Sequence, residues 1–161
     1  MSILAKTAIL FSLLAVTGVA PVFAEDLPPP QNLPVRLARP TVISFGGLWP
    51  RVPGLSVERQ LTDRLGLGAH VGYAVFVGDI GLFGRWYFSD EPGSWYAEAL
   101  TSWSMPFGLG LNGLFGWQYR SPDGLTFNFG AGLGITTLSN PTPVPDIWGL
   151  INVDAGIGYA F

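Results

Sequence analysis

The chain has no cysteine, one histidine and one lysine among its 161 residues. The lack of cysteine excludes structural disulfides, thiol chemistry and an amino-terminal lipid anchor on cysteine. One histidine without cysteine is a poor supply of metal ligands, so we expect neither a metal site nor a cofactor. Apart from Lys6, seven arginines stand against eleven acidic residues. This acidic balance provides no basic field that would attract nucleic acid.

The chain also lacks long apolar runs. After residue 24 no stretch approaches the roughly 18 apolar residues of a spanning helix. The run from Ala8 to Ala20 follows Lys6 and leads to Val22-Phe23-Ala24, the pattern of a secretory signal peptide, so we expect cleavage after Ala24. Residues 25–40 contain five prolines and no strand pattern. We therefore expect a signal peptide at 1–24, a proline-rich periplasmic tail at 25–40 and one domain at 41–161.

What the domain does contain is a series of short alternating runs, separated by proline, glycine and aspartate. In the last run Ile151, Val153 and Ile157 share one strand face, while Asn152 and Asp154 share the other face with glycines. The eight runs that we identify are residues 41–49, 55–61, 65–76, 80–88, 94–104, 107–120, 125–136 and 148–161.

These runs predict an all-β chain with strongly apolar strand faces. A soluble β-sandwich would bury those faces in a core, whereas a membrane barrel turns them toward lipid. Most runs reach the roughly 9 to 11 residues of a tilted spanning strand, and their number is even, as in bacterial single-chain barrels. We therefore predict an eight-stranded antiparallel transmembrane β-barrel with an up-and-down meander, and keep the β-sandwich as the alternative.

Aromatic residues crowd the ends of the runs. Outer-membrane barrels carry such residues as girdles at the two membrane interfaces. Arg59 interrupts an apolar face, so it has to lie near an interface. The predicted interface residues are Trp86, Trp95, Trp117 and Tyr159 at one rim, and Trp49 and Trp103 at the other.

With the glycine-rich faces turned inward, a set of polar side chains lies inside the predicted barrel. Buried charges must pair, and Arg85 with Glu58 or Glu98 is the expected pair. Such a network would fill the lumen and have a structural role. The predicted polar network is Glu58, His70, Arg85, Glu98, Arg120 and Asp154, accompanied by Gln118, Asn128 and Asn152.

Five glycines on two neighbouring runs remove side chains from one part of the lumen. The resulting space could hold a ligand or the proline-rich tail. The interpretation that we favour is that glycine lets the narrow strands bend while large neighbours fill the space. These glycines are Gly108, Gly110, Gly130, Gly132 and Gly134.

The signal-peptide pattern, the eight runs, the segment LSVERQLTDRLGLGAHVGY and the terminal Tyr159-Ala160-Phe161 resemble the small eight-stranded outer-membrane barrels of bacteria. This group contains outer membrane proteins A, X and W and the opacity proteins. The resemblance covers residues 41–161 and concerns a class of architecture. It implies a place in the bacterial outer membrane, contact with outer-membrane lipids, and recognition of Tyr159 and Phe161 by the barrel-assembly machinery.

Members of this group usually bind or adhere through long outer loops. If Phe161 lies at the periplasmic rim, three of the four outer connections here are short, and only 139–146 is sizeable. We therefore expect a structural, envelope-stabilising or surface-interaction role, with other envelope proteins as possible partners. A ligand-binding or weakly conducting barrel is the runner-up.

A lipid-modifying hydrolase is a remote alternative. His70 with Ser102 or Ser44 and an acid such as Glu98 would provide a serine-hydrolase set. However, the chain has no G-x-S-x-G motif, and His70 shares its face with inward-pointing glycines. We therefore expect a protein without enzymatic activity.

Overall fold

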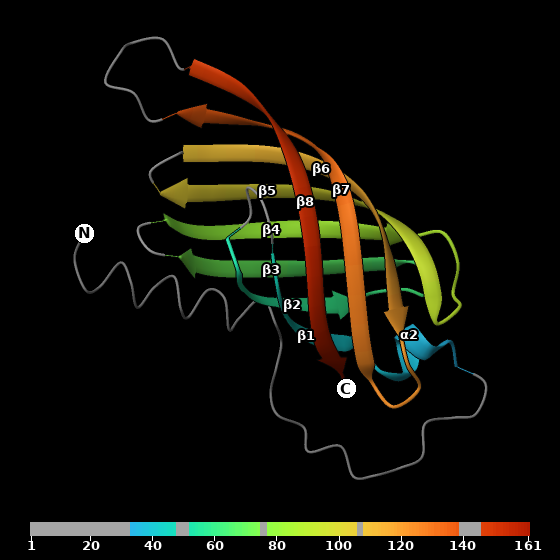
Figure 1. Cartoon of the computed structure of the whole chain (residues 1–161). Coiled ribbons are helices and arrows are strands. Elements are labelled where there is room, and N and C mark those ends of the chain that lie inside the picture. Colours follow the sequence, from blue (N-terminus) through green and yellow to red (C-terminus); the bar gives the residue numbers. More distant parts are fainter. Residues whose placement is uncertain (1–32, 48–51, 75–76, 106–107, 139–145) are drawn as a thin grey trace. The chain divides into compact units, whose positions relative to one another are not determined.

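The computed structural model describes residues 33–47, 52–74, 77–105, 108–138 and 146–161. Eight strands close into one antiparallel barrel in chain order, because β1 pairs with both β2 and β8 (Figure 1). The predicted eight-stranded meander is confirmed. The strands are β1 (Thr41–Gly46), β2 (Gly54–Gln60), β3 (Leu65–Ala74), β4 (Val77–Tyr87), β5 (Gly93–Met105), β6 (Gly108–Arg120), β7 (Leu125–Leu138) and β8 (Asp146–Ala160).

The barrel has polar residues inside and apolar residues outside, which is the reverse of a soluble protein. The period-two pattern places the polar and small residues on the inner face. Among the described residues, 17 polar or charged side chains are buried, against eight hydrophobic ones. On the outside, 27 large hydrophobic side chains are at least 41% exposed. Along β6, for example, Leu109, Leu111 and Phe115 point outward, whereas Asn112 and Leu114 are buried.

The strand boundaries differ from the sequence-based ranges mainly at β4. The sequence-based runs 65–76 and 80–88 leave Val77-Gly78-Asp79 as a turn between them, but β4 already begins at Val77, and Gly72 pairs with Asp79. That expectation was wrong because glycine and aspartate are strong turn formers, while strand pairing here overrides their local preference. As a residue of β4, Asp79 turns its carboxylate into the lumen, where it is 5% exposed.

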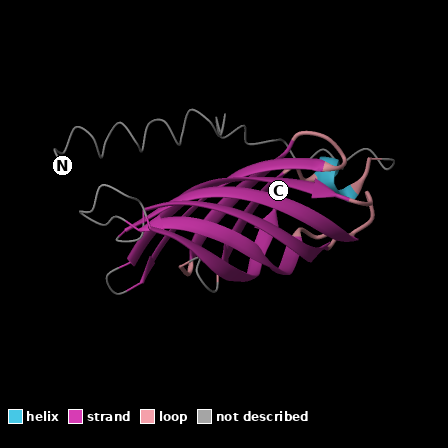
Figure 2. Ribbon diagram, turned by 90° about the horizontal axis from the view of Figure 1, so that it is seen from above, coloured by secondary structure: helices cyan, strands magenta, loops and turns pink. Residues whose placement is uncertain are grey.

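A short helix, α2 (Val35–Ala38), precedes β1 and lies among the loops at one end of the barrel (Figure 2). We call this the α2 end. Arg39 there donates to the backbone oxygen of Ala160, and Phe161 and Thr41 exchange two backbone hydrogen bonds. Helix α2 lies within residues 25–40, the predicted proline-rich tail, for which the sequence indicated no strand. Residues 1–32, which include the predicted signal peptide, lie outside the described part.

No helix in the described ranges is long and apolar enough to cross a membrane.

Candidate functional site

The centre of the lumen is an ion-pair cluster around Arg85 on β4. Its Nε lies 2.5 Å from Oε2 of Glu98 on β5, and its Nη1 lies 2.9 Å from Oε2 of Glu58 on β2. Its Nη2 lies 3.7 Å from Oδ2 of Asp154 on β8. All four residues are at most 5% exposed. The sequence analysis proposed Glu58 or Glu98 as the partner of Arg85, and the structure brings both to it together with Asp154.

Aromatic side chains pack against this cluster. The hydroxyl of Tyr87 donates to Oε1 of Glu58 over 2.7 Å. The Arg85 guanidinium carbon lies 4.7 Å from the ring centroid of Tyr96 and 4.8 Å from that of Phe83, within the range of cation–π attraction. The cluster is thus charge-paired, as burial of charge requires, and it also contacts aromatic rings.

The α2 end of the lumen holds two further arginines. Arg36 of α2 is 0% exposed, and its Nη1 donates to Oε1 of Gln118 over 2.6 Å. Arg120 of β6 is also 0% exposed and donates to the backbone oxygens of Arg36 and Arg39. Its Nη2 lies 3.9 Å from Oε1 of Glu58, which links this end to the central cluster.

His70 lies on the other side of the central cluster with a serine and an aspartate. Its Nδ1 lies 2.9 Å from Oγ of Ser56, and its Nε2 lies 3.7 Å from Oδ2 of Asp79. Ser104 donates to the other oxygen of Asp79 over 2.8 Å. These partners differ from the predicted set of His70, Ser102 or Ser44 and Glu98, and Glu98 instead binds Arg85.

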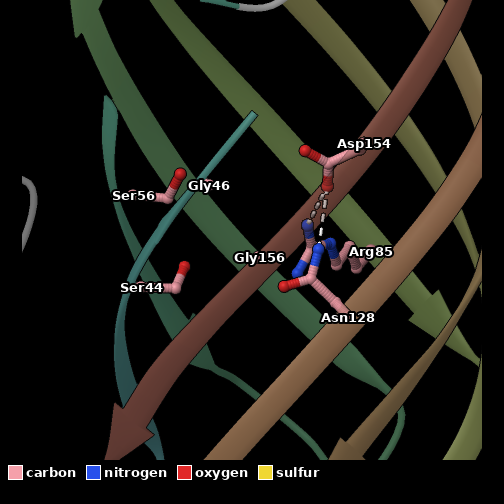
Figure 3. A pocket seen from close by; sticks show the side chains of 7 residues that line it. All are labelled: Ser44, Gly46, Ser56, Arg85, Asn128, Asp154 and Gly156. Atoms are coloured by element: carbon pink, nitrogen blue, oxygen red, sulfur yellow. Dashed lines mark hydrogen bonds and ion pairs between the residues drawn. The ribbon is translucent and has the colours of Figure 1, made fainter. Parts of the chain in front are cut away.

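A small polar cavity lies beside the central cluster, with room for about one water molecule. In Figure 3, Asp154 and Asn128 lie close to Arg85, and the side chains of Ser44 and Ser56 lie apart from them across the cavity. Asn128 donates to Oδ2 of Asp154 over 2.9 Å. A water molecule fits this space, but an acyl or lipid chain does not. The lining residues are Ser44, Gly46, Ser56, Arg85, Asn128, Asp154 and Gly156.

The glycines of β6 and β7 mark close packing. A Cβ at Gly132 would lie 1.9 Å from the backbone oxygen of Gly113, and one at Gly134 would lie 1.8 Å from Oδ1 of Asn112. That oxygen also accepts a hydrogen bond from Asn152 over 2.7 Å. At these two positions, backbone atoms and amide side chains occupy the space that a side chain would need.

We predict that Gly132→Ala destabilises the barrel by about 1–3 kcal/mol, because the added methyl meets backbone that cannot move aside cheaply. Gly113→Ala is the matched control, since a Cβ there would meet only the backbone oxygen of Glu98 at 4.0 Å. Urea titration of both variants in the same detergent measures the difference. Equal unfolding midpoints for the two variants would contradict the close packing.

Most of the predicted interface aromatics that can be described point outward. Trp86, Trp95 and Tyr159 are 50–52% exposed, and Trp117 is half-buried. Trp95 and Trp117 both pack against Phe129, which makes a continuous aromatic patch on β5, β6 and β7. Trp103 is 44% exposed and lies in the half of β5 away from α2, while Trp49 is outside the described residues.

Several residues of the lumen lie outside the predicted network. Asp79 could have been found by extending the inward series of Phe83 and Arg85 back along the chain. Tyr87 continues that series forward, on the same face as Arg85, and was not named in the predicted network. Nothing in the sequence pattern points to Arg36, because a four-residue helix has no readable periodicity.

Among the described residues, no group of three or more histidines, cysteines and acidic residues is placed to hold a metal ion. No protein-family model, curated protein or solved structure matches the chain.

Proposed function

We propose that this protein is an integral outer-membrane β-barrel with a structural role, stabilising the envelope or presenting a surface to other envelope proteins. The observation that carries the proposal is the inverted polarity of the barrel. Its described exterior carries 27 exposed large hydrophobic side chains, and its interior holds the ion pairs. Soluble monomers rarely expose contiguous apolar patches above a few hundred Å², so an exterior of this kind is suited to lipid.

The packing of the lumen supports a structural role over conduction. Arg85 and its three carboxylate partners lie across the middle of the barrel, and Arg36 and Arg120 fill the α2 end. Eight strands enclose a lumen that side chains are able to fill. We therefore expect planar bilayers containing the protein to show no steady ion conductance. Stable open channels would favour the weakly conducting alternative.

The proposed partners follow from the same surfaces. Outer-membrane lipids would contact the apolar exterior, with the aromatic patch of Trp95, Trp117 and Phe129 at one interface. Tyr159 and Phe161 are about half exposed at the end of β8, where the barrel-assembly machinery could bind them. The α2 end would then face the periplasm.

Gel mobility of the protein extracted from isolated outer membranes tests the location. We expect the boiled and unboiled samples to migrate differently, because a closed barrel stays folded in detergent until it is heated. A soluble protein recovered from the periplasm, without a heat-dependent shift, would overturn the proposal.

His70 distinguishes a structural protein from a hydrolase. We predict that His70→Ala lowers stability by about 1–2 kcal/mol through loss of its contacts with Ser56 and Asp79. We expect neither the wild type nor the variant to cleave p-nitrophenyl esters or to deacylate lipopolysaccharide. Wild-type cleavage that His70→Ala abolishes, while the variant remains folded, would show an enzyme.

A further inference from the structure

Arg36 is unusual because it lies outside the strands yet its side chain is 0% exposed. Its guanidinium carbon lies 3.8 Å from the centroid of the Tyr87 ring, at the distance of a cation–π contact. Its Nη1 donates to the side-chain oxygen of Gln118, and its Nη2 lies 3.5 Å from the backbone oxygen of Glu91. Three different chain segments thus form a recess with an aromatic face and oxygen acceptors.

This recess is built for a planar cation. The aromatic face of Tyr87 accepts the flat side of a guanidinium, while in-plane acceptors receive its N–H groups. The hydroxyl of the same tyrosine donates to Glu58, which places a carboxylate at the hydroxyl edge of the ring. A guanidinium therefore matches both the shape and the sign of the charge of the site.

The fit of Arg36 is nevertheless incomplete. Its Nε has no hydrogen-bond partner, although it is buried. Burial lowers the pKa of Arg36 to about 10, which leaves the side chain charged at neutral pH. Arg120 donates to two backbone oxygens of the segment containing α2, so a second cation lies close by. Arg36 is thus held in the recess by few contacts, and burial of its charge costs free energy.

Charge balance gives the recess its preference for cations. The buried residues of the described part include three arginines, at 36, 85 and 120, and four carboxylates, at 58, 79, 98 and 154. Without Arg36, two arginines would remain against four carboxylates. The carboxylate linked to the recess is Glu58, which accepts the hydrogen bond from the Tyr87 hydroxyl.

We propose that the α2 end of the lumen is a binding site for guanidinium-bearing organic cations, that Arg36 occupies it within the same chain, and that residues 33–40 act as a plug with which such cations compete. The structure supports this through the cation–π contact, the oxygen acceptors and the excess of carboxylates. The site is distinct from the apolar exterior, so the inference does not rest on the membrane location.

Chemical rescue of Arg36→Ala in the full chain tests this inference. We expect millimolar methylguanidinium to raise the melting temperature of the variant by about 4 °C, because a ligand that binds only the folded state stabilises it. Methylammonium, which has the charge without the planar fork, should raise it less. The wild type should respond much less, since the external cation there has to compete with Arg36, which the same chain holds beside the recess.

Arg39→Ala is the matched control, because Arg39 belongs to the same segment but its side chain contacts Tyr159 and Ala160 at the rim. An equal response of the two variants, or none in either, would overturn the inference. If Arg36→Ala does not fold alone, it is refolded with methylguanidinium or with methylammonium. Recovery with methylguanidinium alone supports the site, and no recovery or equal yields contradict it.

Discussion

Replacing Arg85 by alanine is expected to reduce the free energy of unfolding by about 3–5 kcal/mol. The reason is that Glu58, Glu98 and Asp154 converge on this one guanidinium from three other strands. Without it, three buried carboxylates would remain close together, with Arg120 3.9 Å from Glu58 and Asn128 donating to Asp154. Removal of one member of a buried charge cluster costs more than the cluster contributes, because the others stay buried without compensation. Urea titration of the refolded barrel measures the loss.

Two variants provide the controls for this prediction. Arg85→Lys keeps the charge without the guanidinium fork, so it should lose less stability than Arg85→Ala. Arg59→Ala removes an exposed arginine whose described contact is a hydrogen bond to Thr41, and should change stability by about 1 kcal/mol or less. An Arg85→Ala protein as stable as Arg59→Ala would contradict the proposed role of the cluster.

Placing an arginine on the outer face is expected to cost about 2–4 kcal/mol in a bilayer when it lies at mid-depth. Leu133 is the position of choice, since it lies in the middle part of β7, is 72% exposed and pairs with Gly113 and Ile151. In water, Leu133→Arg on such an exposed site would be nearly neutral. A large loss of stability of Leu133→Arg after folding into lipid vesicles would therefore show that this face contacts hydrocarbon.

Leu125→Arg is the matched control on the same strand. Leu125 begins β7, where it pairs with Tyr159 at the α2 end. Arginine at an interface costs only about 0–1 kcal/mol because its charged group reaches water. Similar small losses at positions 133 and 125 would argue against a lipid-facing exterior.

The fold was predictable because nearly every strand repeats one rule, alternation of an apolar face with a small or polar one. The rule placed Glu58, His70, Arg85 and Asp154 inside before any contact was known, and electrostatics made Glu58 or Glu98 the partner of Arg85. The rule does not predict how far along the barrel axis each side chain lies, because that position depends on the register between strands. Register is what brings Ser56 and Asp79 to His70.

The α2 end shows a different limit of sequence reasoning. Arg36 lies 82 residues from Gln118 along the chain, and no periodicity connects a proline-rich segment with a strand so distant. Its insertion depends on a space that exists only after the strands have closed. Residues whose contacts are distant in sequence are identified from the assembled barrel and not from the local sequence pattern.

The most direct test of the central claim is the quenching of tryptophan fluorescence in vesicles of brominated lipids. Trp86, Trp95 and Trp103 are 44–50% exposed on the outer face, so a bilayer around the barrel would bring bromine into contact with them. We expect strong quenching by brominated lipids and weak quenching by iodide in the water. Strong quenching by iodide, with no effect of the brominated lipids, would show that these faces contact water and would contradict the membrane barrel.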